Sequence, residues 1–145
     1  MLPAVSALDC LVADLGIDPG DPGLVSYEAT KFLLNRRQPD TTATLVLWQP
    51  DVIGQPFALP DGRGSRLPVL VEYLCGFYPA EHGTIVYMAS PYSLFDPVVL
   101  RVPLGELEQE LLPRVPTLVL PPLGEATIDR AVQERLQLGT AQPGT

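Results

Sequence analysis

Histidine, lysine and cysteine are scarce in this chain of 145 residues, and each scarcity excludes a kind of site. His82 is the single histidine and Lys31 the single lysine. A zinc site built on several histidines is therefore impossible, and the usual zinc spacings are absent. Cys10 and Cys75 show no Cys-x-x-Cys spacing and lie among apolar neighbours, which favours buried free thiols. We expect no metal and no cofactor.

Positive charge is also in short supply, with nine basic residues against seventeen acidic ones and a formal net charge of −8. A surface of that sign repels phosphate, so direct binding to nucleic acid or to an anionic membrane is disfavoured. No apolar run reaches the length that spans a bilayer, and the first residues lack the basic and apolar regions of a signal peptide. We expect synthesis in the cytoplasm and no signal peptide.

Proline and glycine, by contrast, are plentiful, with 17 and 12 residues spread along the chain. Each proline removes a backbone donor and interrupts a helix or a central strand, which predicts short elements and excludes a long helical bundle. Hydrophobic residues make up 46% of the chain, which argues against disorder. A chain of this length and composition predicts a single domain over residues 1–145.

The segment from Leu67 to Ser90 is the centre of the predicted fold. Two runs rich in β-branched and aromatic residues flank the loop Pro79–Gly83, a pattern typical of a β-hairpin. In that hairpin Glu72 lies on the opposite face from the core-facing residues of its strand. The predicted core-facing residues are Val69, Val71, Tyr73, Cys75 and Phe77.

The predicted fold class is α+β, with an N-terminal helical hairpin, a central, mainly antiparallel sheet and short C-terminal helices. We expect the helical part in residues 1–40, the β-rich core in 41–120, a C-terminal helix in 121–139 and a tail in 140–145. The spacing of apolar residues, together with the prolines and glycines that interrupt helices and strands, predicts the individual elements. The helices are Ser6–Leu15, Ser26–Arg37, Gly105–Leu112 and Glu125–Leu138, and the further strands are Thr42–Trp48, Val52–Leu59, Val98–Val102 and Thr117–Leu120.

No catalytic motif is complete. The loop before Leu67 contains glycines and arginines but lacks the order and the lysine of a phosphate-binding loop, so we interpret it as an ordinary β-connection whose role is flexibility or a partner contact. A Cys75–His82 pair is formally possible, yet Cys75 lies within the predicted strand, seven residues before His82 in the loop. Because a strand advances about 3.3 Å per residue, direct contact would require the loop to fold back. We therefore expect no catalytic residues.

These observations predict a non-catalytic structural or adaptor protein that binds other protein chains in a homo- or hetero-oligomeric assembly. A virion component, such as a capsid-cementing or neck protein, fits that description. The expected interface residues are Tyr92, Leu94, Phe95, Arg63 and Arg66. The alternative is a small enzyme or ligand-binding domain with a pocket near Glu72, Cys75 and His82.

Overall fold

The computed structural model describes residues 6–55, 65–90, 92, 94–108 and 111–139, and within them five strands form one sheet in the order β1-β2-β5-β3-β4. β1 and β2 pair in parallel, whereas β5 pairs antiparallel with both β2 and β3, and β4 antiparallel with β3. Three strands, β1, β2 and β3, therefore run in the same direction. The α+β class is confirmed, but the sheet is mixed and not mainly antiparallel. The strands are β1 (Leu24–Glu28), β2 (Thr44–Trp48), β3 (Gly83–Met88), β4 (Val98–Pro103) and β5 (Thr117–Leu120).

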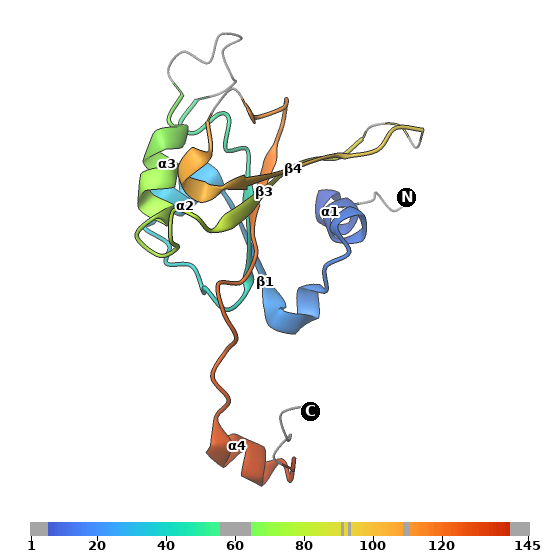
Figure 1. Ribbon diagram of the computed structural model, residues 1–145, viewed down its shortest axis with the longest axis vertical. Helices are drawn as coiled ribbons and strands as arrows, with labels where there is room; N and C mark the ends of the chain where they lie inside the picture. The colour runs from blue at the N-terminus through green and yellow to red at the C-terminus, as the bar shows by residue number, and fades with distance from the viewer. Residues whose placement is uncertain (1–5, 56–64, 91, 93, 109–110, 140–145) are drawn as a thin grey trace.

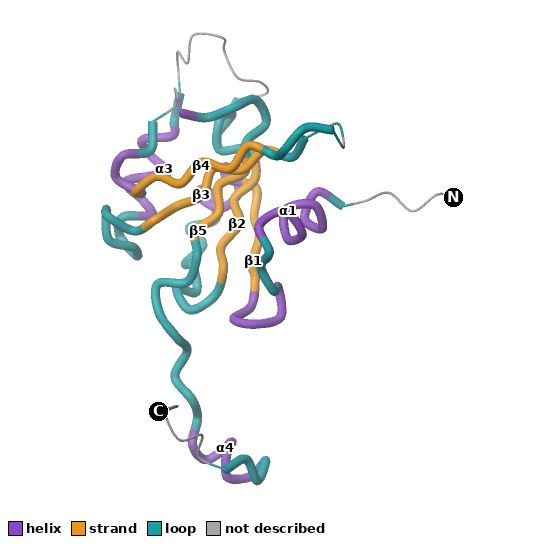
Figure 2. The backbone as a smooth tube through the Cα atoms, turned by 45° about the vertical axis from the view of Figure 1, so that its right-hand side comes forward, coloured by secondary structure: helices purple, strands orange, loops and turns teal. Residues whose placement is uncertain are grey.

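Helices lie on both faces of this sheet (Figures 1 and 2). One hydrophobic core joins α2 and α3 to the first face, and a smaller core joins α1 to the second. The result is three layers with the sheet in the middle. The helical elements are α1 (Ala7–Leu15), η1 (Pro19–Gly23), α2 (Ala29–Leu34), α3 (Leu67–Leu74), η2 (Leu104–Glu106) and α4 (Arg130–Arg135).

The predicted N-terminal helical hairpin is not confirmed, because β1 separates α1 from α2 and the two helices pack on opposite faces. The start of the predicted helix Ser26–Arg37 is in fact strand. Glu28 ends that strand and caps α2, since its carboxylate accepts hydrogen bonds from the Thr30 and Lys31 amides at 2.9 Å each. The cap, more than the apolar pattern, decides where the helix begins.

The predicted hairpin over Leu67–Ser90 is wrong in its first half, which is the helix α3. Leu67, Leu70 and Leu74 are buried at helical spacing, whereas Val69, which the strand interpretation placed in the core, is 53% exposed. Pro68 does not interrupt this helix because it stands in the first turn, where its missing N–H has no partner to lose. The second half of the segment does form a strand, β3.

The last strand in sequence, β5, lies at the centre of the sheet between β2 and β3. All four of its residues are buried. The strands predicted near Thr42–Trp48, Val98–Val102 and Thr117–Leu120 are present within a few residues of their expected bounds. The strand predicted at Val52–Leu59 is a turn as far as Gln55, and its remainder lies outside the described residues.

The C-terminal part differs most from expectation. In the described part of the helix predicted at Gly105–Leu112, the structure has the 3-10 turn η2 and a 3-10 residue at Leu111 in place of an α-helix. α4 is shorter than the predicted Glu125–Leu138 helix and lies at the end of an extended segment, away from the sheet, so it closes neither face (Figure 1). The division into parts stays a prediction, and the tail lies outside the described residues. Among the residues described, no helix combines the length and apolarity that crossing a membrane requires.

Candidate functional site

One edge of the sheet gathers the carboxyl ends of β1, β2 and β3 with the amino ends of β4 and β5. The register places Trp48, Thr117, Tyr87 and Val99 in one row across four strands at this edge. In open sheets with helices on both faces, ligands bind preferentially at the carboxyl ends of the strands. A ligand site is therefore expected at this edge.

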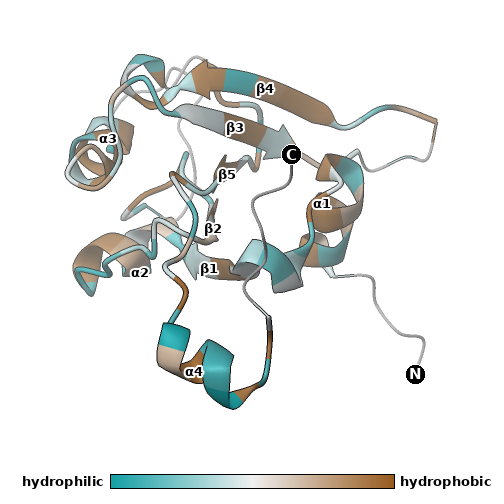
Figure 3. Ribbon diagram, turned by 60° about the horizontal axis from the view of Figure 1, so that its bottom comes forward, coloured by the Kyte–Doolittle hydropathy of each residue, from teal (hydrophilic) through white to brown (hydrophobic). Residues whose placement is uncertain are grey.

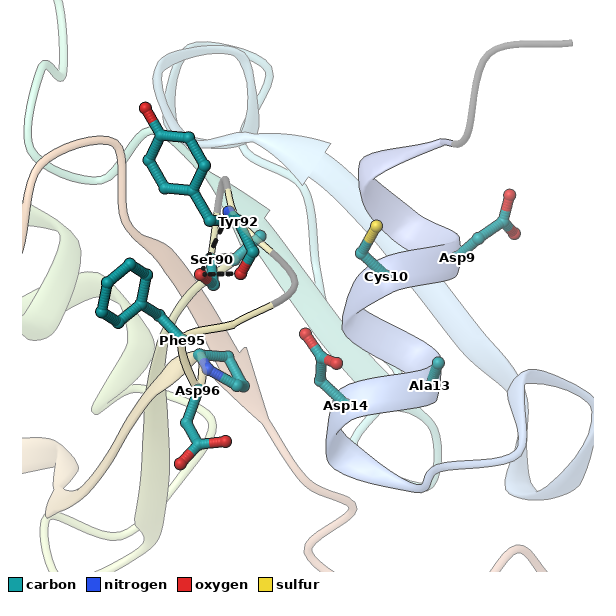
Figure 4. Close-up of a pocket in the computed structure, with 10 residues that line it drawn as sticks. Asp9, Cys10, Ala13, Asp14, Ser90, Tyr92, Phe95 and Asp96 are labelled. Atoms are coloured by element: carbon teal, nitrogen blue, oxygen red, sulfur yellow. Dashed lines mark hydrogen bonds between the residues drawn. The ribbon is translucent and has the colours of Figure 1, made fainter.

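A pocket of about 610 Å³ lies at this edge, between α1 and the connection from β3 to β4 (Figure 4). Its size falls in the range of small-molecule sites, about 300–1,000 Å³. Three carboxylates and two aromatic rings contribute to it. The lining residues are Asp9, Cys10, Ala13, Asp14, Ala89, Ser90, Tyr92, Phe95, Asp96 and Pro97.

The helix α1 supplies the first wall, and its sequence explains how. Ser6 caps the helix by accepting a hydrogen bond from the Leu8 amide at 3.1 Å, and Gly16 ends it in the left-handed conformation with φ of 64°. Leu11, which is fully buried, faces the sheet with its apolar neighbours. The remaining side of the helix carries the pocket-lining residues, two aspartates among them.

Asp14 fixes this wall to the sheet, because the Tyr87 hydroxyl donates a 2.6 Å hydrogen bond to its Oδ2. Burial, helped by this bond to a carboxylate, raises the pKa of Tyr87, so its hydroxyl stays protonated and serves as a donor. Figure 4 shows Asp14 extending from α1 toward the connection between β3 and β4, while Asp9 extends from another side of the helix. Asp14 is thus the carboxylate best placed between the two walls.

The second wall is the aromatic turn between β3 and β4. The Ser90 hydroxyl donates to the Tyr92 carbonyl at 2.8 Å and accepts from the Tyr92 amide at 3.3 Å. The Tyr92 and Phe95 rings meet edge to face with centroids 6.2 Å apart. Both side chains are about two-thirds exposed, at 66% and 68%. The turn therefore offers aromatic surface beside an acidic helix.

Two strained turns occupy the same edge. Gln49 follows β2 with φ of 56°, and Val115 precedes β5 with φ of 52°, both in a region that residues with a Cβ rarely adopt. Asp51 lies between them with its Oδ1 buried and without a hydrogen-bond partner among the described residues. Burial raises the pKa of Asp51, and the backbone amides of Asp51 and Val115 offset this only in part. Backbone strain and a buried carboxylate oxygen without a partner, such as Asp51 Oδ1, concentrate at functional sites.

The raised pKa of Asp51 predicts a specific pH dependence of stability. Below the ordinary pKa of 3.8 the carboxyl is neutral in both folded and unfolded chains. As the pH rises, the unfolded chain ionises first, so this residue lowers the stability until the pH passes its folded pKa. The melting temperature of Asp51→Asn minus that of the parent chain should therefore increase from pH 3 to pH 7. A difference that stays constant or shrinks over this range would contradict the assignment.

The residues of the predicted alternative pocket do not line this site. Glu72 and Cys75 are exposed on and just after α3, so the expectation of a buried Cys75 thiol was wrong. His82 is half-buried, stacks on Tyr78 with centroids 5.0 Å apart, and has its Nε2 2.9 Å from the Pro121 carbonyl oxygen. Within the described ranges, no group of three His, Cys, Asp or Glu side chains is placed to hold a metal ion.

Of the predicted interface residues, Tyr92, Leu94 and Phe95 are all strongly exposed, and two of them line the pocket. Arg66 instead donates from Nη1 to the Ile53 carbonyl at 3.0 Å, and Arg63 lies outside the described residues. Their role in an interface stays a prediction. The sequence interpretation missed Asp14, whose one signal in the sequence is its place on the polar side of the first predicted helix.

The chain shares its fold with a methyltransferase: it superposes on the crystal structure of the methyltransferase CobJ with a TM-score of 0.58, over 89% of this chain and 53% of that one. Identity in that superposition is 12%, so the likeness concerns the fold alone. No family model matches the chain.

Protein sequences give a closer relation. The chain is 37% identical over 145 residues to a methyltransferase/ribosomally synthesized cyclic peptide precursor, that of the gymnopeptides, from Gymnopus fusipes. It is 37% identical over 143 residues to the omphalotin A precursor of Omphalotus olearius. Each alignment takes in 95% of this chain and 34% of the relative. A lentinulin A precursor from Lentinula edodes is 39% identical over 127 residues, 84% of this chain and 30% of the relative.

These findings overturn the prediction of a structural virion protein. The relatives carry a methyltransferase in their names and come from fungi. The alternative prediction, a small enzyme or ligand-binding domain, agrees better with them, although its pocket was expected elsewhere. The chain spans about one third of the length of the curated relatives it matches.

Proposed function

We propose that this chain forms part of a methyltransferase, and that the pocket between α1 and the β3–β4 connection holds the cationic end of a sulfonium methyl donor. The observation that carries the proposal is the identity of 37%, over nearly the whole of this chain, to relatives named as methyltransferase/cyclic peptide precursors. The fold shared with CobJ supports it independently.

The side chains of the pocket suit a sulfonium cation. Asp9, Asp14 and Asp96 bring negative charge, and an opposite unit charge about 4 Å away gains about 1 kcal/mol in water and about 4 kcal/mol near a protein surface. Tyr92 and Phe95 add aromatic faces, which attract cations through the ring quadrupole. A neutral ligand would lack this attraction between opposite charges, and an anionic ligand would be repelled.

The change in charge on the donor sulfur during methyl transfer gives the carboxylates a role in binding the donor. During methyl transfer the donor sulfur loses its positive charge and becomes a neutral thioether. An aspartate beside it therefore stabilises the bound donor more than the transition state, and such an interaction lowers the donor's dissociation constant without speeding the chemical step. Tyr87, kept protonated, holds Asp14 in place and is no general base.

Calorimetry with S-adenosylmethionine as the probe tests the proposal. We expect Asp14→Asn to weaken binding about tenfold, equivalent to about 1.4 kcal/mol. The asparagine oxygen still accepts the Tyr87 hydrogen bond, so the change removes charge and keeps the contact. Binding of the neutral thioether S-adenosylhomocysteine should change less than about twofold, because it lacks the sulfonium charge.

Asp129→Asn is the matched control, since Asp129 is an exposed aspartate at the start of the remote helix α4. It should leave the affinity for both ligands unchanged. Absence of donor binding to the parent chain would refute the proposal. An equal loss of affinity for the charged donor and the neutral thioether would refute the role given to Asp14.

A further inference from the structure

Asp51 is an acidic group for which the donor pocket gives no role. Its side chain is half-buried, and its Oδ1 is buried without a hydrogen-bond partner among the described residues. The backbone amides of Asp51 and Val115 hydrogen-bond to the carboxyl and favour its charged form. The carboxyl therefore connects the turn that follows β2 with the turn that precedes β5. These two strands are neighbours in the sheet (Figure 3).

The turn that carries Asp51 is fixed to the helical layer. The Gly54 amide donates to Thr30 Oγ1 on α2 at 2.9 Å, and Arg66 Nη1 donates to the Ile53 carbonyl at 3.0 Å. Ile53 is itself buried in the core that joins α2 and α3 to the sheet. These contacts keep the Asp51 carboxyl in one position, although that position leaves one of its oxygens unsatisfied.

The turn before β5 is strained and depends on support from its neighbours. Val115 has a φ of 52°, a conformation that is rare and unfavourable for a β-branched residue. Its side chain is 71% exposed, so packing does little to hold it. Strained backbone persists only where surrounding groups fix it. The hydrogen bond to the Asp51 carboxyl is one such support.

This turn leads directly to the donor pocket. Val115 stands two residues before Thr117 in the chain. Thr117 pairs with Trp48 on β2 and with Tyr87 on β3. Tyr87 in turn holds Asp14, a carboxylate of the pocket, through its 2.6 Å hydrogen bond. A shift of the turn before β5 would therefore reach the pocket through packed and hydrogen-bonded neighbours.

We propose that Asp51 is a positioning residue of the donor site: its ionised carboxylate holds the turn at Val115, and protonation of the carboxylate releases that turn. Charge makes the bond strong, because hydrogen bonds to an ionised acceptor are roughly twice as strong as neutral ones. The inference rests on the proposed function, in which the pocket binds the donor. It adds control by protons to that site.

Burial, opposed in part by the two amides, sets the pKa of Asp51 above its ordinary value of 3.8. The charged residues of the segments fastened around it are Glu28 and Lys31 on α2, Arg66 before α3 and Arg114 beside Val115. None of these described groups contributes to the shift. The carboxylate bond is therefore formed at neutral pH and is lost as the pH falls through the raised pKa.

The ionised carboxyl lowers the stability of the folded chain at neutral pH, as its raised pKa requires. Asp51→Asn should therefore raise the melting temperature at pH 7 and at the same time weaken donor binding. A merely structural residue would change stability and affinity in the same direction. Opposite changes are expected of a residue that serves a site and not the stability of the fold.

NMR spectroscopy of the full chain without any donor gives the first test. The shift of the Val115 amide proton should titrate with a midpoint above pH 3.8, and Asp51→Asn should abolish this titration. At pH 7 the variant should exchange its Val115 amide about tenfold faster than the parent chain. This ratio should fall toward one at pH 3, where the parent carboxyl is neutral too. A titration that persists in Asp51→Asn, or a ratio independent of pH, would overturn the proposal.

Calorimetry at pH 7 gives the second test. Asp51→Asn should weaken the binding of S-adenosylmethionine and S-adenosylhomocysteine equally, by about threefold, because it acts through the backbone and not through charge. Asp40→Asn is the matched control, since this exposed aspartate ahead of β2 also accepts a backbone amide, that of Thr42, at 2.9 Å. It should leave the Val115 exchange and both affinities unchanged. An Asp51→Asn variant that binds both ligands as tightly as the parent chain would also overturn the proposal.

Failure of this inference and failure of the proposed function are distinguishable. The NMR and melting measurements need no donor and test the link between Asp51 and Val115 alone. A parent chain that shows the titration but binds no S-adenosylmethionine would confirm the proton-controlled turn and refute the donor site. Donor binding without the titration would confirm the pocket and refute the role of Asp51.

Discussion

Leu70→Ala should destabilise the chain by about 2–5 kcal/mol, whereas Val69→Ala should change its stability by less than about 0.5 kcal/mol. Leu70 is fully buried between α3 and the sheet, and truncation leaves a cavity that the surrounding side chains fill only partly. Val69, one residue earlier, is 53% exposed. Urea unfolding followed by circular dichroism gives both values.

A comparison of Leu70→Ala with Val69→Ala also shows whether this segment is a helix or a strand. In the hairpin interpretation Val69 faces the core and Leu70 the opposite face, so Val69→Ala would be the costly change. A large loss of stability for Val69→Ala together with a small loss for Leu70→Ala would contradict the helix α3. Leu67 and Leu74, buried at the same helical spacing, should behave like Leu70.

Phe32→Ala should lower the free energy of unfolding by about 3–5 kcal/mol. Phe32 is fully buried, and its ring lies 5.7 Å from both the Tyr27 and the Tyr73 ring, centroid to centroid. Aromatic pairs of this kind add about 0.5–1.5 kcal/mol beyond the area they bury. Since about 1 kcal/mol corresponds to about 2–4 °C in a domain of this size, the melting temperature should fall by about 6–20 °C.

Leu34→Ala in the same helix is the control, because Leu34 is 70% exposed and alanine favours the helix. Its melting temperature should stay within about 2 °C of that of the parent chain, by the same relation. A fall for Phe32→Ala no larger than for Leu34→Ala would mean that α2 does not pack on the sheet through Phe32.

Local sequence patterns correctly predicted the elements in which the residue types favour the secondary structure that the packing requires. Thr117–Leu120 and Val98–Pro103 are rich in β-branched residues and form strands in the positions expected. The segment from Leu67 to Leu74 fails for the opposite reason, since its valines and tyrosine favour a strand while its leucines lie three and four residues apart. Burial of the leucines against the sheet overrides the strand preference of the valines and the tyrosine, and the leucine spacing was the local sign of it.

The candidate site was beyond prediction for a different reason. Its two walls, near Asp14 and near Ser90, are separated by most of the sheet in sequence and meet only because α1 and the β3–β4 connection share one edge. Each wall alone is ordinary, one the polar side of a short helix and the other an exposed turn. The prediction that Tyr92 and Phe95 lie at an interface came from two aromatic residues in an expected loop, and not from any motif.

The position of β5 has a consequence for the order of events during synthesis. A nascent chain synthesised only as far as Arg114 contains four of the five strands. It lacks β5, the strand that pairs with both β2 and β3. The β1–β2 and β3–β4 pairs would then each expose an inner edge, both buried in the finished protein. Insertion of the four residues Thr117–Leu120 joins the two halves at once. Folding of the sheet should therefore be late and cooperative, and nascent chains that stop before Thr117 should bind chaperones or aggregate through these two edges.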